Sequence, residues 1–250
     1  MNLQSLAKSI KGQLYFDDTM RTLYATDASA YRELPLAVAI PSCKEDLLRL
    51  IEFARDNKTS IIPRAAGTSL AGQVVGNGIV VDISKHFTQI LSVDEKDSSV
   101  WVQPGVIRDE LNLHLKQFDL FYGPETSTSN RCMIAGMVGN NSCGSRSLIY
   151  GSAREHLLEV KAILADGSET TFKKISTEEF NAKAAGIGTV SDLETQIYKA
   201  TKHIFSDAKN QQEIEDKFPK SSIPRRNTGY ALDILGNMAP FKDGEEEFNF

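Results

Sequence analysis

Residues 124–151 read PETSTSNRCMIAGMVGNNSCGSRSLIYG, a stretch of small and polar side chains between segments that have strand and helix patterns. Its glycines and short polar residues are Gly136, Gly139, Gly144 and Gly151 with Ser127, Thr128, Ser129, Asn130, Asn140, Asn141, Ser142 and Ser145. Glycine lets the backbone approach a ligand, and successive inward N–H groups form an anion-binding nest. Long loops without secondary structure are usually functional or disordered. We expect this second loop to hold a phosphate-bearing ligand; an ordinary surface loop is the alternative.

The composition is that of a globular protein. The 250 residues are 41% hydrophobic and 24% charged, which suffices for one sizeable core or two lobes. The net charge of -5 and the absence of a long Lys/Arg cluster exclude nucleic acid as the expected partner. The N-terminus is too polar for a signal peptide, and no run reaches the length of a membrane span. We therefore expect a cytoplasmic protein and leave a peripheral membrane contact open.

The cysteines and histidines predict neither a disulfide framework nor a metal site. The cysteines are Cys43, Cys132 and Cys143, an odd number without a CxxC pair, which favours a reducing compartment. The histidines are His86, His114, His156 and His203. Their spacing matches no metal-ligand pattern, so we assign them no metal and no catalytic role.

The first third of the chain has the pattern of a small parallel β/α lobe. The predicted elements are a helix at 3–10, an irregular segment at 15–31, a strand at 36–41, a helix at 42–56 and strands at 60–63 and 78–83. Ser42 and Glu45 have the spacing of a capping box at the start of the second helix. Three strands with a helical crossover indicate a parallel sheet.

The rest of the chain favours antiparallel sheet with helices. The predicted elements are a hairpin at 89–103, a helix at 107–118, a hairpin at 157–172 with an Asp-Gly turn, and a helix from Ser191. Glu194 lies at the capping position of that helix, whose apolar stripe is Leu193, Ile197, Ala200, Ile204 and Phe205. A polar run that we expect to be mobile ends at Pro219.

These patterns predict an α+β fold with two lobes. The expected divisions are an N-terminal helical and irregular segment at 1–34, a first lobe at 35–86, a second lobe with an appended helix at 87–218, and a final segment at 219–250. RAAGTSLAGQ at residues 64–73, here called the first loop, follows a strand and carries two glycines. It is neither a P-loop nor a GxGxxG fingerprint. Two anion-cradling loops, one on each lobe, suit a diphosphate in a crevice between them, although either alone could be a turn-rich connection.

Several motifs in order resemble a known family. PRAAGTSLAGQ, NGIVVDIS, QPGV, the second loop and LEVKAILADG are similar to the FAD-binding domain of the vanillyl-alcohol oxidase and p-cresol methylhydroxylase flavoproteins. Within that group the chain resembles the FAD-linked D-2-hydroxy-acid dehydrogenases, which act on lactate, glycolate or 2-hydroxyglutarate. The likeness covers residues 35–172 and resumes at RRNTGYALD, residues 225–233. Ordered motifs are far more specific than any single one.

The resemblance implies three sets of FAD contacts and one further backbone contact. The first loop would wrap the diphosphate through Arg64, Ala65, Ala66, Gly67, Thr68, Ser69, Leu70, Ala71 and Gln73. The flavin ring would lie beside Pro124, Glu125, Thr126, Ser127 and Thr128. The second diphosphate and ribityl contact would come from Gly136, Gly139, Asn140, Asn141, Ser142 and Gly144, with a backbone contact from Ile163.

The resemblance also predicts that FAD binds without a covalent bond. Thr68 stands where many relatives carry the histidine that links the flavin. A minority use a cysteine close to the position of Cys132, for which we favour a packing role. Asp82 is expected to cap a strand end and Tyr150 to fill core. Residues 225–230, RRNTGY, match a motif near the flavin.

The implied reaction is oxidation of a D-2-hydroxy acid to the 2-oxo acid, with hydride transfer to flavin N5. An iron–sulfur or quinone-linked acceptor would then take the electrons. The substrate residues of such enzymes lie beyond the position of Phe250. The resemblance therefore implies an N-terminal part of a longer chain, in which residues 219–250 start the connection to a substrate domain, and we assign no catalytic residue. The alternatives are a non-catalytic FAD or nucleotide-binding module, an FAD reductase of cell-wall precursor synthesis, and a molybdenum-hydroxylase flavoprotein subunit.

Overall fold

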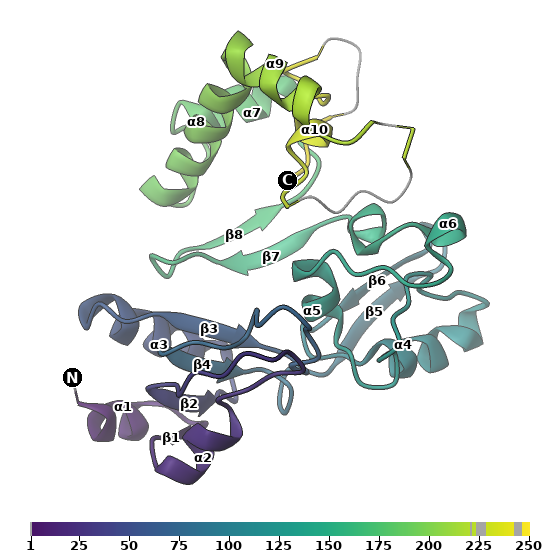
Figure 1. The fold of residues 1–250 in the computed structure, drawn as a ribbon. Coiled ribbons are helices and arrows are strands. Elements are labelled where there is room, and N and C mark those ends of the chain that lie inside the picture. The colour runs from purple at the N-terminus through teal and green to yellow at the C-terminus, as the bar shows by residue number, and fades with distance from the viewer. Residues whose placement is uncertain (1, 221, 224–228, 243–246) are drawn as a thin grey trace. The chain divides into compact units, whose positions relative to one another are not determined.

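The chain forms two compact units, Met1–His156 and Leu157–Phe250, each with its own core. The structure is a computed structural model that describes residues 2–220, 222–223, 229–242 and 247–250 (Figure 1). The sequence predicted four divisions, which were defined by where a ligand would bind. That division stays a prediction. Residues 225–228 of the RRNTGY motif lie outside the described residues.

A four-stranded sheet organises the first unit. Its strands are β1 (Gln13–Tyr15), β2 (Ala37–Ile40), β3 (Ile61–Arg64) and β4 (Ile79–Asp82), in the order β1-β2-β4-β3 (Figure 1). β2, β4 and β3 are parallel, as predicted, and β1 adds an antiparallel edge strand that the sequence did not indicate. Ala37, Val38 and Ala39 are fully buried, which fits a strand covered on both faces.

Two helices cover one face of this sheet. α1 (Leu3–Ser9) and α3 (Lys44–Asp56) pack together. Leu6 of α1 and Leu50 of α3 share a core with Ala37, Ala39 and Ile79. The amphipathic patterns of the two predicted helices are thereby confirmed.

The start of α3 differs from the predicted capping box. The carboxylate of Asp46, rather than Glu45, accepts hydrogen bonds from the Ser42 backbone and hydroxyl at 2.8 and 3.1 Å. It also accepts the backbone N–H groups of Lys11 and Gly12 at 2.7 and 2.8 Å. The predicted Ser42–Glu45 pair is wrong because the N-terminal segment folds back here and brings two further donors to Asp46.

Residues 15–31 are not irregular as predicted. α2 (Asp18–Leu23) begins where the Asp17 side chain accepts the N–H of Met20 at 3.1 Å, the usual bond of an N-cap. The chain then runs beside the first loop, where the N–H of Ala28 donates to the carbonyl of Gly67 at 3.2 Å. The prediction failed because the Asp17 cap stabilises α2 even though this segment has few apolar residues.

The remainder of the first unit follows the predicted order. β5 (Ile90–Asp94) and β6 (Ser99–Val102) form the expected antiparallel hairpin. α4 (Arg108–Leu115) and the turn η1 (Lys116–Phe118) follow, and Leu111 and Leu115 pack on the hairpin. The second loop contains the short helices α5 (Ile134–Gly139) and α6 (Ser147–Tyr150), and the turn η2 (Ala153–His156) comes after it.

The second unit pairs a hairpin with helices. Its elements are β7 (Val160–Ile163), β8 (Glu169–Phe172), α7 (Thr177–Ala184), α8 (Asp192–Ser206), α9 (Ala208–Lys217) and α10 (Leu232–Leu235). The hairpin and the Ser191 cap of α8 are confirmed. α7 was missed, as was α9 in the polar run before Pro219, where the Asp207 side chain caps the helix by accepting the N–H of Lys209 at 2.8 Å.

Aromatic rings fill the core of the second unit. Phe248 is fully buried and lies 4.7 Å from Phe180, centroid to centroid. Tyr198, also buried, stacks edge-on with Phe180 and Phe250. On α8 the buried face therefore contains Tyr198 and Phe205, and of the predicted stripe only Phe205 is fully buried. Within the described residues, none of the helices has the length and hydrophobicity that a membrane span requires.

Candidate ligand site

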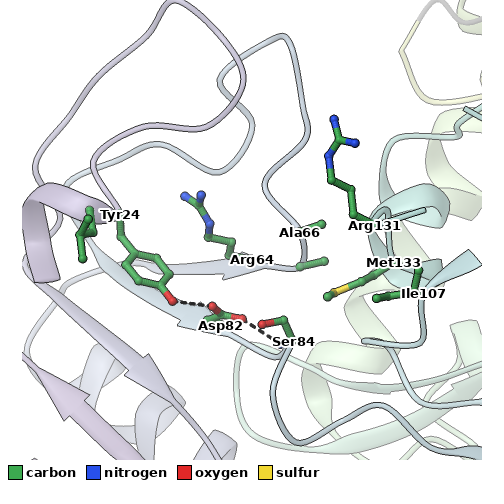
Figure 2. A pocket seen from close by; sticks show the side chains of 10 residues that line it. Tyr24, Arg64, Ala66, Asp82, Ser84, Ile107, Arg131 and Met133 are labelled. Atoms are coloured by element: carbon green, nitrogen blue, oxygen red, sulfur yellow. Dashed lines mark hydrogen bonds between the residues drawn. The ribbon is translucent and has the colours of Figure 1, made fainter. Parts of the chain in front are cut away.

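A cavity of about 300 Å³ opens at the carboxyl ends of β3 and β4 in the first unit (Figure 2). Its walls are formed by Leu23, Tyr24, Arg64, Ala65, Ala66, Asp82, Ser84, Ile107, Arg131 and Met133. The carboxyl ends of parallel strands are where open α/β sheets bind their ligands. The cavity therefore joins the first loop to residues 107–133, which are distant in the sequence.

The first loop presents a run of free backbone donors. Among the described residues, no protein atom accepts a hydrogen bond from the N–H groups of residues 65–70. Gly67 and Gly72 have φ of +66° and +71°, which glycine adopts at little cost. Consecutive unpaired N–H groups in a glycine-containing turn suit an anion.

The side chain of Arg64 is fixed beside these donors. Its Nη1 donates to the carbonyl of Thr26 at 2.8 Å, and its Cζ lies 5.1 Å from the ring centroid of Tyr24. That separation is within the range of a cation–π contact. Figure 2 shows Arg64 and Arg131 on opposite sides of Ala66. The cavity thus carries a guanidinium group from each of the two loops.

A buried carboxylate lies at the base of the same cavity. Asp82 is 8% exposed, and its Oδ2 accepts the hydroxyl of Tyr24 at 2.6 Å while Oδ1 accepts the N–H of Ser84 at 2.8 Å (Figure 2). Burial raises the pKa of Tyr24 well above its ordinary value, and the Asp82 carboxylate raises it further. The Tyr24 hydroxyl is consequently a permanent donor near neutral pH.

Residues 124–128 are held by the helix that precedes them. Arg108 Nε of α4 donates to the carbonyl of Pro124 at 3.0 Å. The hydroxyls of Thr126 and Thr128 lie 3.0 Å apart, and Thr126 also donates to Cys132 Sγ at 3.4 Å. Cys132 is 5% exposed and lies 3.5 Å from Met137 Sδ, so the thiol belongs to a small core.

Glu125 ties the beginning of the second loop to its end. Its Oε1 accepts the hydroxyl of Ser145 at 2.7 Å and the N–H of Arg146 at 3.3 Å. The bond from Ser145 is the main cause that lowers the pKa of Glu125. A Cβ at Gly144 would lie 2.4 Å from the carbonyl oxygen of Glu125, so this approach requires glycine.

The two loops meet in space. Gln73 Nε2 donates to Asn140 Oδ1 at 2.9 Å, and a Cβ at Gly136 would lie 3.4 Å from the Cβ of Ala65. Asn140 Nδ2 also donates to the hydroxyl of Ser142 at 3.2 Å. Of the residues predicted from the two loops, the structure thus brings Gln73 next to Asn140 and Ala65 next to Gly136.

Other predicted residues serve different contacts. Asn141 adopts φ +44°, and its Oδ1 accepts the Ser152 hydroxyl at 2.8 Å and the N–H of Arg154 at 3.0 Å, so this side chain ties the second loop to η2. A Cβ at Gly139 would meet nothing within 4 Å, which leaves open space beside it. Leu70 is 81% exposed at the tip of the first loop. Ile163 lies in β7 of the second unit, and its contact with a ligand stays a prediction.

Sequence reasoning missed seven residues that line the cavity: Leu23, Tyr24, Asp82, Ser84, Ile107, Arg131 and Met133. Asp82 was assigned to a strand end, and its bond to the N–H of Ser84 agrees with that role. Its position at the carboxyl end of a parallel strand could have indicated that it lies near a ligand site. The sequence around Tyr24 offered no such signal, because this residue lies in a segment without a periodic pattern. No group of three potential metal ligands occurs in the part of the chain that the structure describes.

Comparison with known proteins agrees with the geometry. The model of the FAD binding domain family matches residues 35–173, a little over half of the chain. D-2-hydroxyglutarate dehydrogenase of Pseudomonas putida is 34% identical over 99% of this chain and 24% of its own length. Glycolate oxidase subunit GlcD of Bacillus subtilis is 33% identical over 65% of this chain and 37% of its own. The chain spans about a quarter of the length of the first of these relatives.

Solved structures share the fold at low sequence identity. BBE-like 1 variant D396N of Physcomitrella patens matches with a TM-score of 0.60 and 20% identity, over 69% of this chain and 38% of that one. 6-Hydroxy-D-nicotine oxidase of Arthrobacter nicotinovorans matches with a TM-score of 0.57 and 24% identity, over 66% and 36%. At these identities the likeness concerns the fold alone.

Proposed function

The chain belongs to the FAD binding domain family, and from this premise we propose that it is the FAD-binding part of a dehydrogenase that oxidises a D-2-hydroxy acid. Its cofactor is FAD. The predicted α+β FAD-binding fold is confirmed. The observation that carries the proposal is the meeting of the two glycine-bearing loops, with unpaired N–H groups and an arginine beside a cavity.

The donor set of the first unit fits the diphosphate of FAD. A diphosphate needs several hydrogen-bond donors and positive charge without a competing carboxylate. We assign the N–H groups of residues 65–70 and the guanidinium of Arg64 to this role. Gly139 leaves open space on the second loop, and Gly136 lets that loop lie against Ala65 of the first.

We further propose that FAD binds without a covalent bond. Thr68 has no nucleophilic side chain of the kind that histidine offers. The thiol of Cys132 is 5% exposed, accepts a hydrogen bond from Thr126 and lies against Met137. A thiol engaged in this way is a packing element, in keeping with the burial that is common for free cysteines.

Bound FAD supplies the hydride acceptor, and the residues of this chain bind and orient it. Residues 124–128 are assigned to the flavin ring from the family resemblance. Their backbone is held by Arg108, which donates to the Pro124 carbonyl, and by the Thr128 N–H, which donates to the Thr126 hydroxyl. The substrate class, a D-2-hydroxy acid such as 2-hydroxyglutarate, glycolate or lactate, is proposed from the names of the relatives. An iron–sulfur or quinone-linked electron acceptor and a cytoplasmic location belong to the same proposal.

The test has two stages. The purified chain is mixed with FAD, and its affinity is measured by quenching of flavin fluorescence; trichloroacetic acid precipitation then shows whether the colour stays with the protein. We expect binding, and release of flavin on precipitation.

The longest available form of the protein is next mixed anaerobically with D-2-hydroxyglutarate, D-lactate and glycolate, with the L-hydroxy acids as controls. Bleaching by a D-2-hydroxy acid or glycolate is expected. Failure to bind FAD would overturn the proposal, and bound flavin that no hydroxy acid bleaches would favour a non-catalytic module.

A further inference from the structure

The cavity at the ends of β3 and β4 contains opposite charges that do not pair. Asp82 is 8% exposed, and Arg64 and Arg131 line the same 300 Å³ space. Among the described residues, no ion pair joins Asp82 to either arginine. Buried carboxylates normally acquire a charged or hydrogen-bonding partner because desolvation is costly. Something else must therefore satisfy Asp82.

Two donors occupy both oxygens of this carboxylate. Oδ2 accepts the hydroxyl of Tyr24 at 2.6 Å, and Oδ1 accepts the backbone N–H of Ser84 at 2.8 Å. The backbone donor is present whatever side chain occupies position 84. The Tyr24 hydroxyl is the contribution that a single side-chain substitution removes.

Tyr24 also contacts the cation on its other side. The Arg64 guanidinium lies 5.1 Å from the centre of the Tyr24 ring, and its Nη1 donates to the Thr26 carbonyl. One tyrosine thus contacts both groups: its hydroxyl donates to the carboxylate, and its ring lies against the guanidinium. A tyrosine hydroxyl is protonated near neutral pH, and burial, followed by Asp82, raises the pKa of Tyr24 further above its ordinary value.

We propose that Tyr24 is a positioning residue that keeps Asp82 from neutralising Arg64, so that the guanidinium stays available for the diphosphate of the ligand. This inference rests on the proposed FAD site. Tyr24 lies 40 residues before Arg64 in a segment to which the sequence assigned no chemistry. Its effect is exerted through Asp82 and Arg64 rather than through contact with the reacting atoms.

Loss of the hydroxyl would convert the carboxylate into a competitor. In Tyr24→Phe the ring remains, but Asp82 Oδ2 is left buried without a donor, and the nearby guanidinium is the cation available to satisfy it. An Arg64–Asp82 pair would withdraw positive charge from the anion. Removing the charge of Asp82 as well should abolish this competition.

The experiment compares the wild-type chain with Tyr24→Phe, Asp82→Asn and the double variant. Dissociation constants are measured for FAD by fluorescence quenching and for inorganic pyrophosphate by calorimetry, each at two salt concentrations. Tyr198→Phe, which removes the hydroxyl of a buried tyrosine in the second unit, is the control. Circular dichroism and thermal unfolding check that every variant is folded.

We expect Tyr24→Phe to raise the dissociation constants of FAD and pyrophosphate about tenfold, because the ligand would lose a charge-assisted contact. Asp82→Asn should bind pyrophosphate more tightly, by roughly threefold, because a negative charge leaves the cavity. The double variant should recover at least wild-type affinity for pyrophosphate, an outcome that a purely structural role of Tyr24 does not produce.

The negative outcomes separate the two proposals. A wild-type chain that binds neither FAD nor pyrophosphate overturns both. A wild-type chain that binds FAD, with unchanged affinity in Tyr24→Phe or without recovery in the double variant, overturns the role of Tyr24 alone. If Tyr24→Phe does not fold, the test is Asp82→Asn alone. Binding of pyrophosphate to Asp82→Asn that is weaker than to the wild-type chain would then overturn the role of Tyr24.

Discussion

Gln73 Nε2 donates a hydrogen bond to Asn140 Oδ1 over 2.9 Å, and this contact joins two loops that are 67 residues apart in the chain. Gln73 Oε1 in turn accepts the hydroxyl of Ser69, so a single side chain connects the tip of the first loop to the end of α5. Because both loops are assigned to one cofactor, this bond fixes the separation of the two halves of its site.

Gln73→Ala should therefore weaken FAD binding without unfolding the chain. Loss of one neutral hydrogen bond amounts to about 1 kcal/mol, or roughly fivefold in Kd. The measurement is fluorescence quenching of FAD. Gln117→Ala, which removes an exposed amide bonded to its own helix through the His114 carbonyl, is the matched control. Equal affinities of the two variants would contradict the role given to Gln73.

Gly67→Ala tests the conformation of the first loop. The residue has φ +66°, and an added Cβ would lie 2.5 Å from Nη2 of Arg64, so the guanidinium must move. We expect a stability loss of about 1 kcal/mol and a rise of about tenfold in the Kd for FAD. Gly167→Ala is the control, because its φ of +87° causes similar strain while its Cβ would meet nothing within 4 Å. If Gly167→Ala raised the Kd for FAD as much as Gly67→Ala does, backbone strain alone would explain the effect.

Asp46 should make the stability of the first unit depend on pH. Burial raises the pKa of Asp46, but hydrogen bonds from Ser42, Lys11 and Gly12 outweigh it, so the pKa is lowered overall. A lowered folded-state pKa gives stability that is present above the unfolded value of about 4 and is lost as pH falls through the folded one.

Urea unfolding between pH 3 and 7 measures this contribution. Asp46→Asn should cost about 2 kcal/mol at pH 7 and flatten the fall in stability toward low pH. Asp56→Asn, an exposed position in the last turn of the same helix, should change neither. An unaltered pH profile in Asp46→Asn would show that other carboxylates control acid unfolding.

Phe248 should be essential to the second unit. It is fully buried, with its ring centroid 4.7 Å from that of Phe180 and 4.9 Å from that of Phe250. Phe248→Ala removes an aromatic core side chain, at a cost of about 3–5 kcal/mol. Thermal unfolding should show a large decrease for this variant and little change for Phe121→Ala, whose ring is 56% exposed. A small effect of Phe248→Ala would mean that residues 247–250 do not stabilise this core.

The sequence predicted most elements because their signals are local. The strand 36–41 carries a continuous apolar run, and the residues of α4 recur at helical spacing. Three of the elements that were missed, α2, α7 and α9, are short or polar helices held by caps at Asp17, Ser176 and Asp207. A cap stabilises a helix even where hydrophobic periodicity is weak.

What the sequence determined by itself is the class of the chain: an α+β protein with two glycine-bearing loops, whose ordered motifs match a family that binds FAD. Only the tertiary structure decided how the charges of the cavity are arranged. Tyr24 and Asp82 are 58 residues apart, and their contact depends on how the segment after α2 packs at the end of β4. No periodic pattern encodes such a contact, because it arises from packing between distant segments.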